Sequence, residues 1–155
     1  MNTLRRNVLK GAAGAGTVAV AVAAGLLKPT QAMAAWNEAA FEAKNVGDAM
    51  KGLGVSGPVD SKDIAIKAPD IAENGAVVPV EVTSSIAGTT SIAIIAEKNA
   101  TPLVGNFNLS GGALGFIFTR IKMGQTALVR AVVKAGGKTY TAAKEVKVTI
   151  GGCGG

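Results

Sequence analysis

The sequence predicts a mainly β protein: an immunoglobulin-like antiparallel β-sandwich with an N-terminal helix and a flexible C-terminal arm. After Pro58, about seven short runs rich in β-branched residues follow one another, with turn residues between them and no helical segment. Parallel strands need long crossover connections, so runs this close together favour antiparallel pairing. A chain of 155 residues fits a single domain of this kind.

The first 34 residues are expected to be an export signal. The first ten contain three basic residues and no acid, and the 17 residues that follow are small and apolar. This order is typical of a signal peptide, whereas the apolar run is short for the alternative, a membrane anchor. Ala32-Met33-Ala34 provides a small-x-small cleavage pattern, so the mature chain is expected to start at Ala35, or alternatively at Trp36.

The leader resembles a twin-arginine export signal, with Arg5-Arg6 followed by an apolar residue and then Leu9-Lys10. It departs from that pattern at Leu4, where Ser or Thr is usual, and at Val8, which replaces the favoured Phe. The resemblance implies a periplasmic protein that is exported already folded. Because no cofactor ligands are visible, we expect a partner subunit without its own signal to be exported with this chain.

The composition excludes several classes of function. The chain has no histidine and one cysteine, so the usual general base and the commonest metal ligand are missing. The net charge is +6, but four basic residues lie in the signal, which leaves 12 basic and 10 acidic residues, or +2. We therefore expect no enzymatic activity, metal or cofactor, no nucleic-acid binding, and no membrane attachment after signal cleavage.

Residues 35–150 are expected to form the sandwich domain. Apolar positions recur near helical spacing from Trp36 to Leu53, which predicts one amphipathic helix that ends at Gly52 and Gly54 and packs on the sheet. Gly136-Gly137 predicts a two-residue hairpin turn between the last two strands. The expected strands are 64–67, 76–83, 92–97, 103–109, 115–122, 126–135 and 138–150.

The last expected strand ends abruptly. Val146, Val148 and Ile150 alternate with polar residues, which places one face of this strand in the core. The alternation stops at Ile150, so residues 151–155 are predicted to lie outside the sandwich.

Those five residues are Gly151, Gly152, Cys153, Gly154 and Gly155. Glycine has the largest backbone freedom of any residue, so this segment is predicted to be a flexible arm. Its thiol can stand roughly 10 Å beyond Ile150, on a backbone thin enough to enter a narrow channel in another protein. Cys153 is therefore a candidate attachment point for a small substrate. A free thiol is mostly protonated at neutral pH, so activation is expected from the enzyme that the arm enters.

Two points stay open from the residues alone. The alternative to a carrier is an exported interaction module that dimerises through an intermolecular disulfide at Cys153. In addition, Phe116-Ile117-Phe118 places apolar side chains on both faces of one strand, which is either a partner surface or a strand buried on both sides. Arg120 and Lys122 either rim that surface, attract an anionic adduct or are simply solvated.

Four segments besides the leader resemble the SoxY family of the sulfur-oxidising (Sox) system. The most specific is the terminal Gly-Gly-Cys-Gly-Gly. The others are Ala72-Glu73-Asn74-Gly75-Ala76-Val77-Val78-Pro79-Val80, Thr119-Arg120-Ile121-Lys122-Met123 and Val146-Lys147-Val148-Thr149.

This resemblance implies a carrier of intermediates of thiosulfate oxidation. A haem enzyme would conjugate Cys153 to thiosulfate, a hydrolase would release sulfate, and a sulfane dehydrogenase would oxidise the remaining sulfane sulfur. Cys153 would thus hold thiosulfonate, persulfide and sulfonate adducts in turn. The resemblance also implies a SoxZ-like subunit as the stable partner, in a heterodimer or larger assembly.

Overall fold

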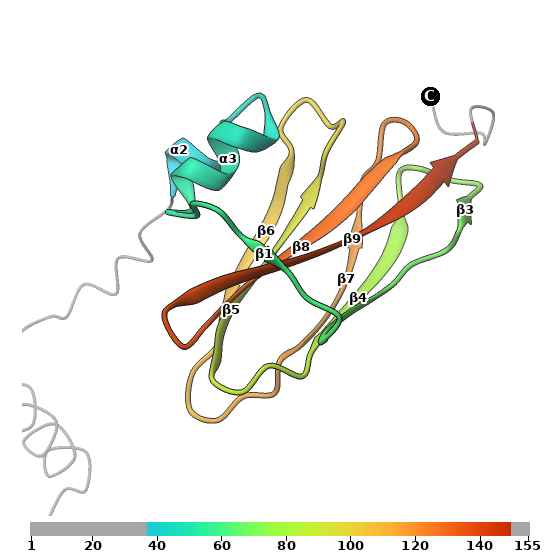
Figure 1. The fold of residues 1–155 in the computed structure, drawn as a ribbon. Coiled ribbons are helices and arrows are strands. Elements are labelled where there is room, and N and C mark those ends of the chain that lie inside the picture. The colour runs from blue at the N-terminus through green and yellow to red at the C-terminus, as the bar shows by residue number, and fades with distance from the viewer. Residues whose placement is uncertain (1–36, 150–155) are drawn as a thin grey trace, which may run out of the picture. The chain divides into compact units, whose positions relative to one another are not determined.

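The computed structural model describes residues 37–149, and it confirms the mainly β prediction (Figure 1). A larger sheet and a smaller sheet pack face to face. The larger has the order β1 (Val59–Asp60), β9 (Lys138–Val148), β8 (Ala127–Ala135), β5 (Thr89–Ala96) and β6 (Leu103–Asn108), with β3 (Ile71–Ala72) also paired to β9. The smaller has the order β2 (Ile64–Lys67), β4 (Val78–Ser84) and β7 (Phe116–Ile121).

The hairpin predicted between the last two strands is confirmed. β8 and β9 are antiparallel, from Ala135 opposite Lys138 to Ala127 opposite Val146. The two turn residues, Gly136 and Gly137, have φ values of 55° and 74°, which glycine adopts without the penalty of a Cβ atom. β9 is therefore paired with β8 over nearly its whole length, from the turn to Val146.

Two very short strands were not predicted. β1 and β3 run parallel to β9, with Val59 opposite Tyr140 and Ile71 opposite Lys147. A strand of two residues has no periodicity to read in a sequence. Both strands add hydrogen bonds to β9, which is the strand that leads to the C-terminus.

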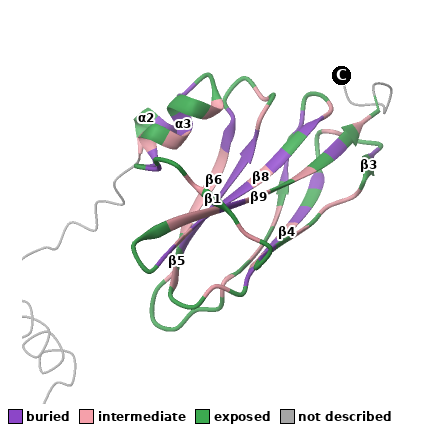
Figure 2. Cartoon of the chain, in the orientation of Figure 1, coloured by how far each residue is buried: buried purple, intermediate pink, exposed green. Residues whose placement is uncertain are grey.

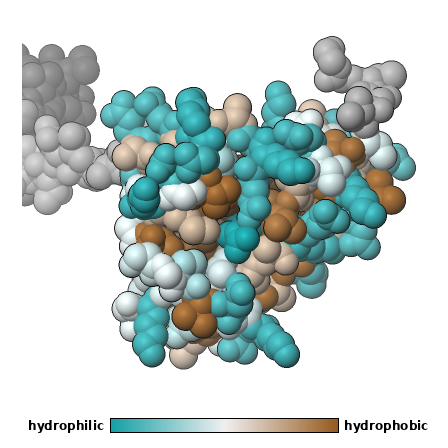
Figure 3. Space-filling model, turned by 45° about the horizontal axis from the view of Figure 1, so that its top comes forward, coloured by the Kyte–Doolittle hydropathy of each residue, from teal (hydrophilic) through white to brown (hydrophobic). Residues whose placement is uncertain are grey.

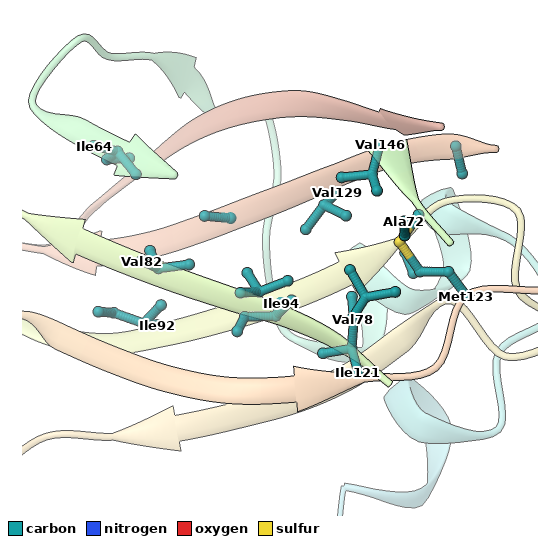
Figure 4. Close-up of a cluster of buried hydrophobic side chains, with 14 of the residues drawn as sticks. Ile64, Ala72, Val78, Val82, Ile92, Ile94, Ile121, Met123, Val129 and Val146 are labelled. Carbon is teal, nitrogen blue, oxygen red and sulfur yellow. The ribbon is translucent and has the colours of Figure 1, made fainter. Parts of the chain in front are cut away.

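The main core lies between the two sheets (Figure 4). Its largest side chains come from β-branched residues on facing strands, such as Val80 and Val82 of β4, Ile94 of β5 and Val129 of β8, each of which is fully buried. Burying one such side chain contributes about 1.5–3 kcal/mol. The low aromatic content is therefore compensated by close packing of aliphatic groups.

Strand β5 is covered on both faces, which explains its continuous apolar run (Figure 2). Ile92 and Ile94 face the main core, whereas Ala93 and Ile95 face a second cluster with residues of the N-terminal helical segment. A strand buried on both sides loses the apolar–polar alternation of a half-exposed strand.

The prediction of one helix over residues 36–53 is wrong in detail. Residues 37–53 form two short helices, α2 (Glu38–Phe41) and α3 (Val46–Gly52). Asn45 has an extended backbone, and its side chain accepts a hydrogen bond from the Asp48 N–H, so it caps α3 and starts a new helix.

Contact between the two helices gives the physical reason for the break. In a continuous helix Ala40 and Gly52 would lie about 18 Å apart. In the structure a Cβ atom on Gly52 would stand 2.6 Å from the Ala40 backbone, and Asn37 donates a hydrogen bond of 2.7 Å to the Gly52 carbonyl. The helices therefore fold back on each other. The predicted end is confirmed, because α3 stops at Gly52 and Gly54 has a φ of 67°.

Candidate functional site

The structure describes the residues from which the C-terminal segment extends, Val148 and Thr149, which we call the root of this segment. Cys153 and its flanking glycines Gly151, Gly152, Gly154 and Gly155 lie outside the described residues, as does the predicted export signal. The described chain reaches Thr149, one residue past β9. The predicted attachment point therefore follows the end of β9 by five residues and the last described residue by four.

The end of β9 is held from both sides. On one side the Val148 N–H donates a hydrogen bond of 2.9 Å to Oγ1 of Thr126. On the other side the Thr149 N–H donates to the Ala72 carbonyl over 3.1 Å, and the Lys147 N–H donates to the Asp70 carbonyl over 3.0 Å. Any segment that follows Thr149 thus starts from a fixed point.

A tight turn packs directly against this root. Oδ1 of Asn74 accepts a hydrogen bond of 2.9 Å from the Ala76 N–H, and the Gly75 carbonyl accepts one of 2.7 Å from the Met123 N–H. A Cβ atom on Gly75 would collide with the Met123 carbonyl oxygen and stand 2.8 Å from Cγ1 of Val148. Only glycine fits here without a shift of the neighbouring backbone.

Segments that are far apart in the sequence therefore meet at one end of the domain. Residues 72–80, 119–123 and 146–149 carried the family resemblance, and the contacts of Gly75, Met123 and Val148 bring all three together. Sequence reasoning identified the segments but did not predict that they are neighbours, because their contact depends on the register of strands in two different sheets.

A shallow pocket of about 480 Å³ lies at the same end, between the β5–β6 loop and the β7–β8 loop. Its polar lining includes Lys98, Asn99, Thr101 and Lys122. Asn99 joins the two loops: its Nδ2 donates to the Lys122 carbonyl over 2.7 Å and its Oδ1 accepts from the Gly124 N–H over 3.2 Å. Figure 3, in which this end of the domain is turned forward, shows hydrophilic and hydrophobic residues intermixed on the surface.

Lys98 and Asn99 were missed by the sequence reasoning. Asn99-Ala100-Thr101-Pro102 reads as an ordinary turn between two strands, and nothing in it points to Lys122. The cross-loop hydrogen bonds become visible only in the folded chain.

The charged groups near the root differ in their partners. Lys144 Nζ lies 3.0 Å from Oδ1 of Asp70, and Arg130 is 2.7 Å from Oε1 of Glu97. Lys98 and Lys122 are exposed and make no ion pair with any acid among residues 37–149. These two ammonium groups at the pocket are therefore available to an anion.

Asp48 is the carboxyl group, within the described residues, whose titration is clearly altered. The hydrogen bond from the Asn45 side chain, and then the nearby Lys51 ammonium, hold the pKa of this exposed group below its usual value. Its small contribution to helix capping is present above the usual carboxyl pKa and is lost as the pH falls through the lowered value. Asp48 lies in the first turn of α3, so its lowered pKa concerns this helix and not the C-terminal root.

Two kinds of feature are absent from residues 37–149. No three His, Cys, Asp or Glu side chains in this part of the chain are grouped so that they could hold a metal ion. None of its helices is long and apolar enough to cross a membrane.

Strand β7 is one edge of the smaller sheet, and it exposes aromatic residues. Phe116 and Phe118 are 45% and 55% exposed, whereas Ile117 on the opposite face packs against the main core. The guanidinium carbon of Arg120 lies 5.9 Å from the ring centre of Phe118, within the range of a cation–π contact. The alternative of a strand buried on both sides is therefore wrong for the part of the chain that the structure describes.

Comparison with known proteins relates this chain to one family. The family model described as sulfur oxidation protein SoxY matches residues 50–153, a range that includes Cys153. The solved structure of the sulfur carrier protein SoxY from Chlorobium limicola f thiosulfatophilum is 44% identical, with a TM-score of 0.62, over 68% of this chain and 97% of that chain.

The other comparisons add little. An engineered protein of known structure matches at 17% identity, over 56% of this chain and 20% of its own, with a TM-score of 0.39, which is too distant to compare in detail. No curated protein sequence matches. The family match spans more than half of the sequence and agrees with the sandwich and with the segments that meet at the root of the C-terminus, so this chain belongs to the SoxY family.

Proposed function

We propose that this chain is a sulfur carrier of the Sox system, which holds intermediates of thiosulfate oxidation on Cys153 and presents them to separate enzymes. The observation that carries the proposal is the 44% identity to a sulfur carrier over 97% of that protein, together with a family match that includes Cys153. The rigid root at Val148 and Thr149 supports the same role, because a presenting arm needs a fixed origin.

The loading step joins two sulfur atoms. The Cys153 thiol and thiosulfate lose two electrons and one proton in total, and an S–S bond forms to give Cys–S–S–SO3⁻. A separate haem enzyme accepts the electrons, since this chain has neither a histidine nor a second cysteine. The thiol needs activation in that enzyme, because at neutral pH only a few per cent of a free thiol is thiolate.

The later steps return the thiol. Hydrolysis of the terminal S–SO3⁻ bond by water releases sulfate and leaves a persulfide. A sulfane dehydrogenase removes six electrons and six protons from the outer sulfur of this group and adds three oxygens from water, which gives Cys–S–SO3⁻. A second hydrolysis releases another sulfate and regenerates Cys153. In this scheme the chain binds and presents, and other proteins catalyse.

A labelling experiment tests carriage. Thiosulfate labelled with ³⁵S in its sulfane position is given to thiosulfate-grown cells, and the periplasmic proteins are separated without reductant. We expect label on the mature chain that dithiothreitol removes, because reductants cleave S–S bonds. Thiosulfate oxidation with no label on this chain, or with label only on other proteins, would contradict the proposal.

We also propose that the chain reaches the periplasm through the twin-arginine route, together with a SoxZ-like partner that has no signal. The exposed Phe116 and Phe118 on β7 supply an apolar surface for such a subunit. The expectation follows from the paired Arg5 and Arg6, because this route carries folded complexes.

Replacing both arginines by lysine tests the export proposal. Arg5→Lys/Arg6→Lys keeps the charge of the leader but removes the guanidinium pair, so both this chain and its partner are expected to stay in the cytoplasm. Immunoblots of cell fractions measure this. A partner that still reaches the periplasm with the variant would show that it is exported independently.

A further inference from the structure

We propose that Asn74 is a site of spontaneous modification, at which the folded chain converts asparagine to isoaspartate and thereby loosens the root of the C-terminal segment. The sequence contains one Asn-Gly pair, Asn74-Gly75, and Asn74 is exposed in the turn between β3 and β4. The reaction needs only water, so it does not depend on the sulfur chemistry proposed for Cys153.

The modification is an intramolecular acyl transfer. The backbone nitrogen of Gly75 attacks Cγ of the Asn74 side chain and forms a new C–N bond. The bond from Cγ to Nδ2 breaks, and ammonia leaves with the proton that the Gly75 nitrogen loses. Water then opens the resulting succinimide ring. Attack at one ring carbonyl gives aspartate, and attack at the other gives isoaspartate, in which the main chain runs through the former side chain.

The attacking nitrogen is accessible. The Gly75 N–H donates no hydrogen bond within residues 37–149, whereas the carbonyl of the same residue accepts one of 2.7 Å from the Met123 N–H. Gly75 also has no Cβ atom to obstruct the approach to Cγ. Every other asparagine among residues 37–149 is followed by a residue that has a side chain, so Asn74 is the asparagine for which this attack is least hindered.

The side chain under attack is already oriented by the turn. Oδ1 of Asn74 accepts a hydrogen bond of 2.9 Å from the Ala76 N–H, and the Val77 N–H donates to the Asn74 carbonyl over 3.3 Å. Negative charge develops on Oδ1 as the nitrogen adds to Cγ, and a backbone N–H that already points at this oxygen stabilises that charge. Nδ2 donates no hydrogen bond within the described chain, so no group there retains the leaving nitrogen.

Isoaspartate would disturb the contacts that hold the root. The turn packs so closely that a Cβ atom on Gly75 would collide with the Met123 carbonyl oxygen and stand 2.8 Å from Cγ1 of Val148. Isoaspartate inserts an additional carbon into the main chain and moves the oxygen that accepts from the Ala76 N–H, so Gly75 can no longer keep its place. Aspartate at position 74 keeps both the length of the main chain and the accepting oxygen. The two products of one ring should therefore differ in their effect on β9.

The tryptic peptide 68–98 reports on Asn74 alone, because it contains no other asparagine and no glutamine. The mature protein, with Cys153 alkylated, is incubated at mildly alkaline pH, beside the same protein in denaturing guanidinium chloride. We expect the mass of this peptide to rise from that of the amide to that of the acid at least as fast in the folded protein as in the denatured one. Conversion that is slower in the folded protein, or absent from both samples, would overturn the proposal.

Asn74→Ser is the matched variant. A serine hydroxyl can accept from the Ala76 N–H in a similar turn, but it offers no carbonyl carbon to the Gly75 nitrogen, so peptide 68–98 should keep its mass. Asn108→Ser removes an exposed asparagine that precedes Leu109 and should leave the conversion at Asn74 unchanged. A mass gain of peptide 68–98 in Asn74→Ser would show that the reaction does not use Asn74.

The effect on the root is measured on the separated products. An L-isoaspartyl methyltransferase with a radiolabelled methyl donor identifies the isoaspartate form after ion-exchange chromatography. In this form we expect faster amide exchange at Met123, whose N–H donates to Gly75, and at Thr149, whose N–H donates to Ala72, whereas Asn74→Asp should exchange like the wild type. Exchange in the isoaspartate form that equals the wild type would overturn the predicted loosening of the root.

Discussion

Cys153→Ser is expected to abolish sulfate formation from thiosulfate, to the level of cells that lack the chain. A serine hydroxyl cannot form the S–S bond of the first intermediate, so no later step has a substrate. The thermal unfolding midpoint should not change, because residues that precede Ile150 already form both hydrophobic clusters of the sandwich. Sulfate production by complemented deletion cells measures the first effect, and circular dichroism of the purified protein measures the second.

The control for Cys153→Ser keeps one thiol in the molecule but moves it. Ser110 is exposed in the loop between β6 and β7, away from the root of the arm. Cys153→Ser/Ser110→Cys therefore has a reactive thiol that is not on the arm, and it should not restore sulfate formation. Restoration by this variant would mean that any exposed thiol suffices and that the arm has no special role.

Gly75→Ala is expected to give the largest loss of stability among single substitutions at the root. The new Cβ would collide with the Met123 carbonyl oxygen and stand 2.8 Å from Cγ1 of Val148, and both groups are fixed by strands of different sheets. Overpacking of this kind costs about 1–3 kcal/mol. In a domain of this size each kcal/mol lowers the melting temperature by about 3–6 °C.

Gly124→Ala supplies the comparison for stability. Gly124 lies in the adjacent loop, and a Cβ atom there would meet nothing within 4 Å. Its melting temperature should therefore stay close to that of the wild type, and amide exchange at Val148 and Thr149 should accelerate only in Gly75→Ala. Equal effects of the two substitutions would show that the turn at Gly75 does not hold the end of β9.

Local sequence signals were sufficient for part of the fold. The β8–β9 hairpin was predictable because Gly136-Gly137 and the flanking alternation lie next to each other in the chain. The split between α2 and α3 was not, because it depends on the approach of Gly52 to Ala40. The strands β1 and β3 escaped prediction because two residues carry no periodic pattern.

The candidate site shows the same division. The role of Cys153 as a candidate attachment point could be predicted from the sequence, because the reactivity of a thiol and the backbone freedom of its flanking glycines are local properties. The root and the pocket depend on tertiary structure, because Gly75 meets Met123, and Asn99 meets Lys122, only when the two sheets are stacked in a particular register. The family resemblance included Gly75 and Met123 but did not explain why they matter. The structure shows that they pack against the end of β9.

The most direct test of the carrier role is the intact mass of the mature chain from the periplasm of thiosulfate-grown cells, with and without reductant, beside Cys153→Ser. The account predicts added masses of thiosulfonate, persulfide or sulfonate groups that depend on Cys153; reductant should remove the groups held through an S–S bond. An unmodified thiol, or only a disulfide-linked dimer, would contradict it and favour an interaction module joined through Cys153.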